Sequence, residues 1–209
     1  MTGGSKSQDR KPGSAEQRIL AAASAEFADK GFYGARTQTI ADAAGLNKAM
    51  LHYYFRSKDN LYRTVLKDNF TRIWRQLEEI FLQQEPMSTR LDRIVDLYLD
   101  TFALNPNLLK LMLREMAGGG ERLKQLLTEL SAAGAAPVGL LGQASLDLKI
   151  NQEEVLQVFL SVISMCVFTF VVTPFLTTLF NYDSSELESF RTRRRASIKA
   201  MLKAYLKEE

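Results

Sequence analysis

A tight turn between two short apolar segments constrains the fold of this chain more than any other part of its sequence. Residues 37–55 read TQTIADAAGLNKAMLHYYF, and apolar residues recur at helical spacing on both sides of Gly45. Glycine is suited to leave a helix through a left-handed conformation. Asn47 is a good N-cap, because its side-chain oxygen can accept a hydrogen bond from an unpaired amide of the next helix. The segment therefore predicts a helix-turn-helix, whose second helix can enter the major groove of DNA.

The positive charge of the chain is concentrated around this segment. Residues 1–60 contain nine Lys or Arg and six Asp or Glu, whereas residues 61–209 contain eighteen of each, so the net charge of +3 arises from the first part. Cations that contact phosphates displace the counterions condensed on a duplex, and this distribution favours double-stranded DNA as a partner. An excess of this size also occurs by chance, so the charge alone does not decide the partner.

The sequence offers little material for catalysis or metal binding. It has a single cysteine, Cys166, and a single histidine, His52. An intramolecular disulfide is therefore impossible, which fits a cytoplasmic compartment, and the first residues lack the pattern of a secretory signal. No second ligand or base stands at a useful spacing from His52, and the glycines at 118–120 lack the Lys-Ser/Thr of a phosphate-binding loop. We expect no enzyme, no catalytic residue, no cofactor and no metal site.

The order of the helical segments predicts an all-α chain of about nine helices. Residues 1–13 contain almost no large apolar residues and are expected to form a disordered N-terminal arm. Residues 14–60 are expected to form the helix-turn-helix DNA-binding domain, and residues 61–209 a helical ligand-binding and dimerisation domain. The breaker-rich stretch 134–142 is expected to be a kink or a loop. The expected helices cover about 14–31, 37–45, 48–54, 57–86, 89–104, 108–116, 121–133, 151–180 and 184–206.

The apolar segment 151–180 leaves a second class of protein open. It has no charged residue from 155 to 182, and such a run can cross a bilayer. A membrane-associated helical protein anchored by 155–180 is therefore the alternative. The Ser and Thr side chains and Pro174 within the run favour instead a helix that is buried in protein. Buried apolar helices near the C-terminus also favour self-association as a two-fold homodimer, without contact to a membrane.

Residues 31–62, GFYGARTQTIADAAGLNKAMLHYYFRSKDNLY, resemble the DNA-binding signature of the TetR family of transcriptional regulators. The resemblance implies a homodimer in which each N-terminal domain binds half of a palindromic operator. It also implies a larger domain that dimerises and accepts a ligand, with repression as the usual mode of action. The matching elements are Gly31-Phe32, Ile40-Ala41, Ala44-Gly45, the Leu51-x-x-Tyr54-Phe55 run and Ser57-Lys58-x-x-Leu61.

The resemblance also implies which side chains contact DNA. Arg36 replaces the Ser or Thr of many members, so we expect the helix cap to shift to Thr37 and Arg36 to reach a phosphate. His52 stands where tyrosine is frequent in the family, and Tyr54 where histidine is frequent. Their polar groups can donate to phosphates or bases, and packing in the small core is the alternative for the tyrosines. The predicted DNA-binding residues are Arg36, Thr37, Gln38, Lys48, Ala49, His52, Tyr53, Tyr54 and Lys58.

A cavity between the central helices and the helix after Asn151 is expected to receive a small apolar effector. Methionine suits such a cavity, because its flexible side chain adapts to ligands of varied shape. The scarcity of charge in this part of the chain favours a neutral or hydrophobic ligand. Ordinary core packing is the alternative for each residue, since an apolar helical stripe usually faces a core. The predicted ligand-binding residues are Tyr98, Phe102, Met112, Met116, Met165, Phe168 and Thr169.

Overall fold

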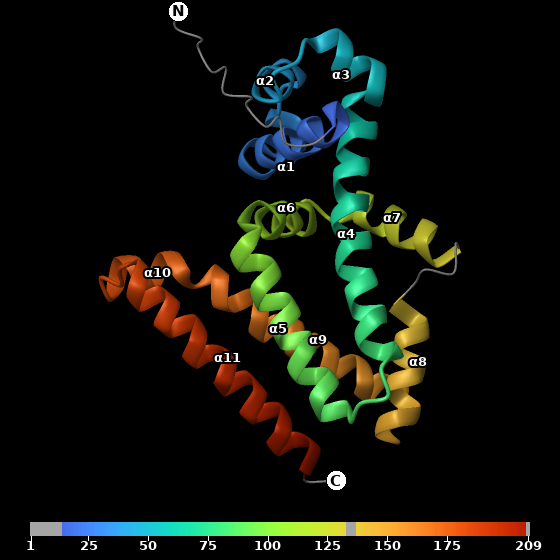
Figure 1. Ribbon diagram of the computed structural model, residues 1–209, viewed down its shortest axis with the longest axis vertical. Coiled ribbons are helices and arrows are strands. Elements are labelled where there is room, and N and C mark those ends of the chain that lie inside the picture. Colours follow the sequence, from blue (N-terminus) through green and yellow to red (C-terminus); the bar gives the residue numbers. More distant parts are fainter. Residues whose placement is uncertain (1–13, 133–136, 208–209) are drawn as a thin grey trace, which may run out of the picture. The chain divides into compact units, whose positions relative to one another are not determined.

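The computed structural model describes residues 14–132 and 137–207, and this part of the chain consists of eleven helices without a strand (Figure 1). The all-α class predicted from the sequence is confirmed. The predicted disordered arm, residues 1–13, lies outside the described residues. The helices are α1 (Ala15–Gly34), α2 (Thr37–Ala43), α3 (Lys48–Phe55), α4 (Lys58–Leu82), α5 (Met87–Leu104), α6 (Pro106–Ala117), α7 (Glu121–Ala132), α8 (Pro137–Leu148), α9 (Gln152–Val171), α10 (Thr173–Leu179) and α11 (Ser184–Lys207).

The chain divides into two compact units, Met1–Val65 and Leu66–Glu209, and α4 contributes residues to both. The division falls after Val65, five residues beyond the end of the predicted helix-turn-helix domain at residue 60. Because α4 runs from Lys58 to Leu82, both positions lie within this helix. The first turns of α4 therefore fold with α1 to α3, and the remainder folds with α5 to α11.

The N-terminal unit builds its small core from α1, α2, α3 and the first turns of α4. α1 begins with a capping box, in which the Ser14 hydroxyl accepts from the Gln17 amide and the Gln17 side chain accepts from the Ser14 amide. Phe27 and Tyr62 meet edge to face with their ring centroids 4.8 Å apart, which is a favoured aromatic geometry. The buried apolar residues of this unit are Ile19, Ala23, Phe27, Ala28, Ala35, Ile40, Ala41, Ala44, Leu51, Phe55, Leu61, Tyr62 and Val65.

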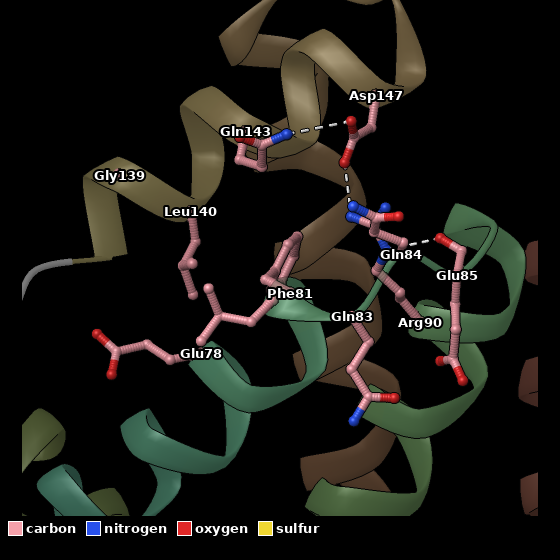
Figure 2. Close-up of a pocket in the computed structure, with 11 residues that line it drawn as sticks. Glu78, Phe81, Gln83, Gln84, Glu85, Arg90, Gly139, Leu140, Gln143 and Asp147 are labelled. Carbon is pink, nitrogen blue, oxygen red and sulfur yellow. Dashed lines mark hydrogen bonds and ion pairs between the residues drawn. The ribbon is translucent and has the colours of Figure 1, made fainter.

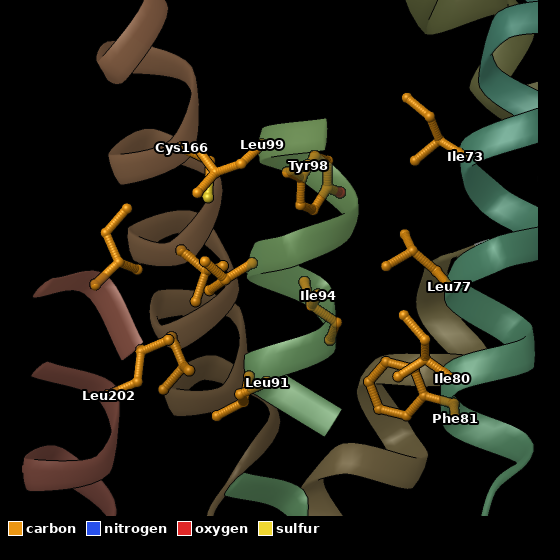
Figure 3. Close-up of a cluster of buried hydrophobic side chains, with 14 of the residues drawn as sticks. Ile73, Leu77, Ile80, Phe81, Leu91, Ile94, Tyr98, Leu99, Cys166 and Leu202 are labelled. Carbon is orange, nitrogen blue, oxygen red and sulfur yellow. The ribbon is translucent and has the colours of Figure 1, made fainter. Parts of the chain in front are cut away.

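The second unit is organised around α5, which packs against α9 and α11. Apolar side chains point from α5 in more than one direction, as expected of a helix with neighbours on several sides. Figure 3 shows Leu99 of α5 lying toward Cys166 of α9, whereas Ile94 and Tyr98 lie toward the segment of α4 that belongs to this unit. The core of the second unit therefore extends from α11 through α9 and α5 to α4.

The structure has two helices more than the sequence predicts. The expectation of a kink or loop over 134–142 is wrong for residues 137–142, because α8 begins at Pro137; residues 134–136 lie outside the described part. Proline is tolerated in the first turn of a helix, where its missing amide would have no partner in any case. The glycines at 139 and 142 weaken a helix without preventing it.

The second additional helix arises because the predicted segment 151–180 is interrupted. α9 ends at Val171, and α10 begins at Thr173 with Pro174 in its first turn. Pro174 has no amide to donate, and its ring clashes with the carbonyl four residues earlier, so it ends the preceding helix. By length and composition, α9 is apolar enough to cross a membrane. In the second unit, Val155, Val158, Val162 and Cys166 of this helix are buried.

Candidate DNA-binding surface and effector cavity

The turn between α2 and α3 has the geometry that its sequence predicts. Gly45 has a φ of 66°, and the Leu46 amide donates to the Ala41 carbonyl at 2.9 Å, so the glycine supplies the left-handed residue that ends α2. The Asn47 side chain accepts from the Met50 amide at 2.8 Å, which makes it the N-cap of α3. These contacts fix the point at which α3 leaves the turn.

α3 buries one side and exposes the other. Leu51 and Phe55 are buried in the core of the N-terminal unit. The residues at the first, second, fifth and sixth positions of the helix are all exposed and share the other side. They offer an ammonium, a methyl group, an imidazole and a phenol, which are groups that can contact base edges or phosphates. We call this surface the α3 face; it comprises Lys48, Ala49, His52 and Tyr53.

Arg56, which the sequence prediction omitted, lies beside the α3 face. Its guanidinium carbon lies 5.8 Å from the centre of the Tyr53 ring. Its amide donates to the His52 carbonyl at 2.8 Å, and its φ is 62°, an uncommon conformation for a residue other than glycine. Arginine is a frequent partner of DNA phosphates. The sequence signal that could have identified Arg56 is its place between the last residue of α3 and Ser57, whose hydroxyl accepts from the Asn60 amide in the first turn of α4 at 3.0 Å.

The start of α2 differs from the prediction. Arg36, and not Thr37, is the N-cap of α2, and no side chain caps this helix end. The Arg36 amide donates instead to the Glu26 carboxylate of α1 at 3.1 Å, so a distant residue supplies the acceptor. The Gln38 side chain donates to Asp42 at 2.8 Å. The side chains of Arg36 and Gln38 are exposed and that of Thr37 is half-buried.

Lys58 and Tyr54 lie closer to the core than the residues of the α3 face. The Lys58 ammonium donates to the Tyr33 carbonyl at 3.3 Å and lies 5.0 Å from the centre of the Phe32 ring. It has to leave both partners to reach a phosphate. Tyr54 is 39% exposed, and its ring meets that of Tyr53 at 5.5 Å. Part of the Tyr54 ring is therefore used in packing.

The second unit contains an apolar cavity of about 460 Å³, a size typical of ligand pockets. α4, α5 and α9 form much of its wall, and none of the described side chains that line it carries a charge. Among the predicted ligand-binding residues, Tyr98, Phe102 and Met112 line this cavity. The structure thus brings three of the seven predicted residues together at one site.

The other four predicted residues do not line the cavity. Met116 and Phe168 are exposed, and Met165 packs against the core. Thr169 is buried, and its hydroxyl donates to the carbonyl of Met165 at 2.8 Å. The sequence prediction also missed wall residues on α4, α7 and α8, among them Trp74 and Leu140. Their signal was the apolar periodicity of these helices, which does not distinguish a cavity wall from ordinary core.

A second and larger cleft, of about 860 Å³, lies where α4, α5 and α8 meet (Figure 2). Figure 2 shows the Arg90 side chain reaching Asp147, with Gln143 on the other carboxylate oxygen. Arg90 also donates to the Glu85 carbonyl at 2.8 Å. Arg90 is the one cation among the described residues that line this cleft, and it is already paired with Asp147. The cleft therefore offers no free positive charge to an anionic ligand. The apolar cavity is the better candidate for an effector site.

The match to a protein-family model lies in the N-terminal unit. The family model described as "Bacterial regulatory proteins, tetR family" matches residues 19–65, which include the whole helix-turn-helix and the first turns of α4. The N-terminal unit is that of a TetR-family regulator. TetR-family proteins are regulators of transcription and not enzymes, in agreement with the expectation from the sequence.

Several curated relatives match over about half of the chain. The HTH-type transcriptional regulator RutR of Escherichia coli (strain K12) is 33% identical over 113 residues, which are 54% of this chain and 53% of RutR. The HTH-type transcriptional repressor SCO4008 of Streptomyces coelicolor (strain ATCC BAA-471 / A3(2) / M145) is 31% identical over 106 residues, which are 51% and 52% of the two chains. The chain therefore spans about half the length of the curated relatives that it matches.

The likeness of the fold covers more of the chain. The crystal structure of the transcriptional regulator SCO4942 from Streptomyces coelicolor is similar over 90% of this chain and 98% of that chain, with a TM-score of 0.62 and 24% identity. At this identity the likeness concerns the TetR fold alone. It extends that fold beyond residues 19–65 into the helical second unit.

Proposed function

We propose that this TetR-family chain is a cytoplasmic, sequence-specific regulator whose α3 face binds a double-stranded DNA operator. The observation that carries this proposal is the position of Lys48 and His52 on the exposed side of α3, opposite the buried Leu51 and Phe55. Such a helix fits the major groove, where ammonium and imidazole groups can donate to bases or phosphates and Ala49 can meet a thymine methyl. The remaining predicted contacts, and Arg56, are proposed to bind the DNA backbone.

We also propose that the chain acts as a two-fold homodimer. Large apolar side chains are exposed on α9 and α10, including Phe168 at 59% and Phe175 at 60%, and Met201 and Tyr205 of α11 are exposed as well. Large exposed apolar side chains on neighbouring helices are costly unless a partner covers them. A two-fold dimer would present two α3 faces to the two halves of a palindromic operator.

The proposed mode of action is repression that a small apolar effector relieves. Ile73, Trp74 and Leu77 of α4 line the apolar cavity, and the same uninterrupted helix begins at Lys58 in the N-terminal unit. An effector that displaces the cavity segment of α4 would therefore also displace its first turn. Half-sites lie about 34–36 Å apart along one face of the duplex, so a changed separation of the α3 faces lowers affinity. SCO4008, named a repressor, supports this mode.

A mobility-shift titration with the DNA upstream of the chain's own gene tests the DNA-binding proposal. Lys48→Ala should weaken binding about tenfold or more, or reduce the salt slope by about one if Lys48 contacts a phosphate. Lys110→Ala removes an exposed cation from α6 in the second unit and should leave both quantities unchanged. If Lys48→Ala behaves like this control, the α3 face is not the DNA-binding surface.

The alternative function is that of a membrane-associated protein anchored by 155–180. The exposure of α9 favours the membrane anchor, because only 28% of its most apolar 18-residue stretch is buried within the chain. The proposed dimer accounts for the same exposed surface. Size-exclusion chromatography without detergent separates the two: a particle of twice the 23.6 kDa chain mass supports the dimer, and Phe175→Glu should shift it toward the monomer. Recovery only in detergent would support the anchor.

A further inference from the structure

A polar atom faces the apolar cavity of the second unit. Figure 3 shows the hydroxyl oxygen of Tyr98 pointing from α5 toward Ile73 of α4, and both residues line the cavity. Within the described residues this hydroxyl has no hydrogen-bond partner. A hydroxyl that faces an apolar cavity without a partner forgoes a hydrogen bond that it makes in water. The cavity therefore contains a donor that a bound molecule can use.

The second polar atom at the cavity wall is already paired. The indole nitrogen of Trp74 donates to the Glu78 carboxylate at 2.7 Å, and Glu78 itself does not line the cavity. The other described lining residues have hydrocarbon side chains or the thioether of Met112. Among the described lining residues, Tyr98 therefore has the polar group that is available to a ligand.

The wall also lacks a partner for a charged ligand. No described lining residue is a cation that would compensate a carboxylate, and none is an anion that would compensate an amine. A buried charge without a partner is strongly disfavoured. Burial raises the pKa of Tyr98 to about 12, so the phenol keeps its proton at neutral pH and can donate it in a hydrogen bond.

We infer that the effector is an uncharged lipophilic molecule with an oxygen acceptor, such as a ketone or an ester, and that Tyr98 donates a hydrogen bond to this oxygen. The inference rests on the proposed effector function of the cavity and narrows it to one chemical class. Acids and amines of the same size are excluded from that class because they would leave an unpaired charge in the cavity. Leu156 and Leu160 of α9 line the cavity and are still exposed, so the hydrocarbon part of the ligand would cover them.

The fluorescence of Trp74 can report on binding without DNA, because Trp74 lines the cavity and is the single tryptophan of the chain. Three ten-carbon probes separate the chemical classes: decan-2-one is neutral with an acceptor, 1-bromodecane is neutral without oxygen, and decanoate is an anion. We expect a saturable change with decan-2-one, at a dissociation constant at least about tenfold below that of decanoate.

Two variants test the contact and the place of binding. Tyr98→Phe keeps the ring and removes the hydroxyl. It should therefore weaken the binding of decan-2-one about fivefold to tenfold and leave the affinity for 1-bromodecane unchanged. Val167→Phe enlarges a lining residue of α9 and should weaken both neutral probes, with circular dichroism as the check that the variant is folded. A signal that survives in a folded Val167→Phe protein would place the probes outside the cavity and overturn the inference.

The outcomes distinguish this inference from the proposed function. Equal affinities for decanoate and decan-2-one, an unchanged ketone affinity in Tyr98→Phe, or no saturable binding of the ketone would each overturn the inference. None of these results touches the DNA-binding proposal, which the mobility shift tests by itself. Ketone binding that depends on Tyr98, together with a chain that binds no DNA, would instead overturn the proposed function.

Discussion

The ammonium of Lys199 on α11 donates to a carboxylate oxygen of Asp96 on α5 at 2.6 Å. Arg195 donates to the other oxygen of Asp96 at 2.7 Å and also reaches Asp100, whose hydrogen bond raises the pKa of the guanidinium. Acidic residues on α5 and basic residues on α11 recur at intervals of four, so each set shares one side of its helix. The resulting ladder joins Arg195, Lys199 and Lys203 to Asp92, Asp96 and Asp100.

The ladder predicts that Asp96→Asn lowers the stability of the second unit. The change removes the charge that Lys199 and Arg195 share, and these side chains are only partly exposed. We expect a loss of about 1 to 2 kcal/mol in the free energy of unfolding, more than an exposed pair provides. Urea denaturation at low and at high salt measures it, and the loss should shrink at high salt.

A matched control for this prediction lies on α11 itself. Glu188 pairs with Arg191 at 2.5 Å, three residues apart on the exposed surface. Glu188→Gln should change the free energy of unfolding by less than about 0.5 kcal/mol. Equal losses in Asp96→Asn and Glu188→Gln would mean that the ladder does not join the two helices.

Gly45 and Gly139 predict opposite effects of the same substitution. Gly45 has a φ of 66°, and a β-carbon there would meet the Arg18 guanidinium, which donates to the Ala44 carbonyl, at 3.4 Å. Gly45→Ala should therefore cost about 1 to 2 kcal/mol. A β-carbon at Gly139 meets nothing within 4 Å, and Gly139→Ala within α8 should stabilise by up to about 1 kcal/mol. Thermal unfolding checks both signs, and a stabilising Gly45→Ala would contradict the turn geometry.

The N-terminal unit is largely predictable from its sequence because its determinants are local. The left-handed turn at Gly45 and the cap at Asn47 each depend on one residue and its immediate neighbours. The error at Arg36 has the opposite origin. The acceptor for its amide is Glu26 on another helix, and no local pattern indicates that this carboxylate lies close to the start of α2.

The cavity is less predictable because it depends on how distant segments pack. Helical spacing indicates that Tyr98 and Phe168 both belong to apolar stripes, yet Tyr98 lines the cavity and Phe168 is exposed. Spacing places a side chain on one side of a helix, but it does not show whether another helix, empty space or solvent lies there. Trp74 was missed for the same reason, since the apolar positions of α4 were interpreted only as those of a connecting helix.

The ion pair between the buried Arg90 and the more exposed Asp147 predicts a measurable effect of removing the arginine. Arg90 is buried, lies 2.5 Å from Asp147 of α8 and also donates to the Glu85 carbonyl. Arg90→Ala removes the cation beside Asp147, the donor to the Glu85 carbonyl and the buried arginine stem, so we expect a loss of about 2 kcal/mol. Arg93 pairs with the Glu85 carboxylate in a more exposed position, and Arg93→Ala should cost less than about 1 kcal/mol. Similar losses in the two variants, measured by urea denaturation, would contradict the burial of Arg90.

The stability of the fold should decrease in alkaline solution because of Cys166. This thiol is fully buried, and burial raises its pKa from 9.0 to about 12. Between these values the folded chain keeps a proton that the unfolded chain releases, so the free energy of unfolding falls as the pH rises, by roughly 1 kcal/mol per pH unit. Burial also raises the pKa of Tyr98 from 10.0 to about 12, so this phenol adds a further loss of stability at higher pH.

Cys166→Ala separates the thiol from the other groups that titrate in this range. The variant has a lower stability at pH 7, because the smaller side chain leaves a cavity in the core. Its stability should nevertheless decline less steeply than that of the parent chain between pH 9 and 10, where Tyr98 contributes less than the thiol and contributes equally in both proteins. Denaturant titrations across this window measure both slopes. Parallel declines would mean that the folded chain releases the Cys166 proton as readily as the unfolded chain does, which a fully buried thiol does not.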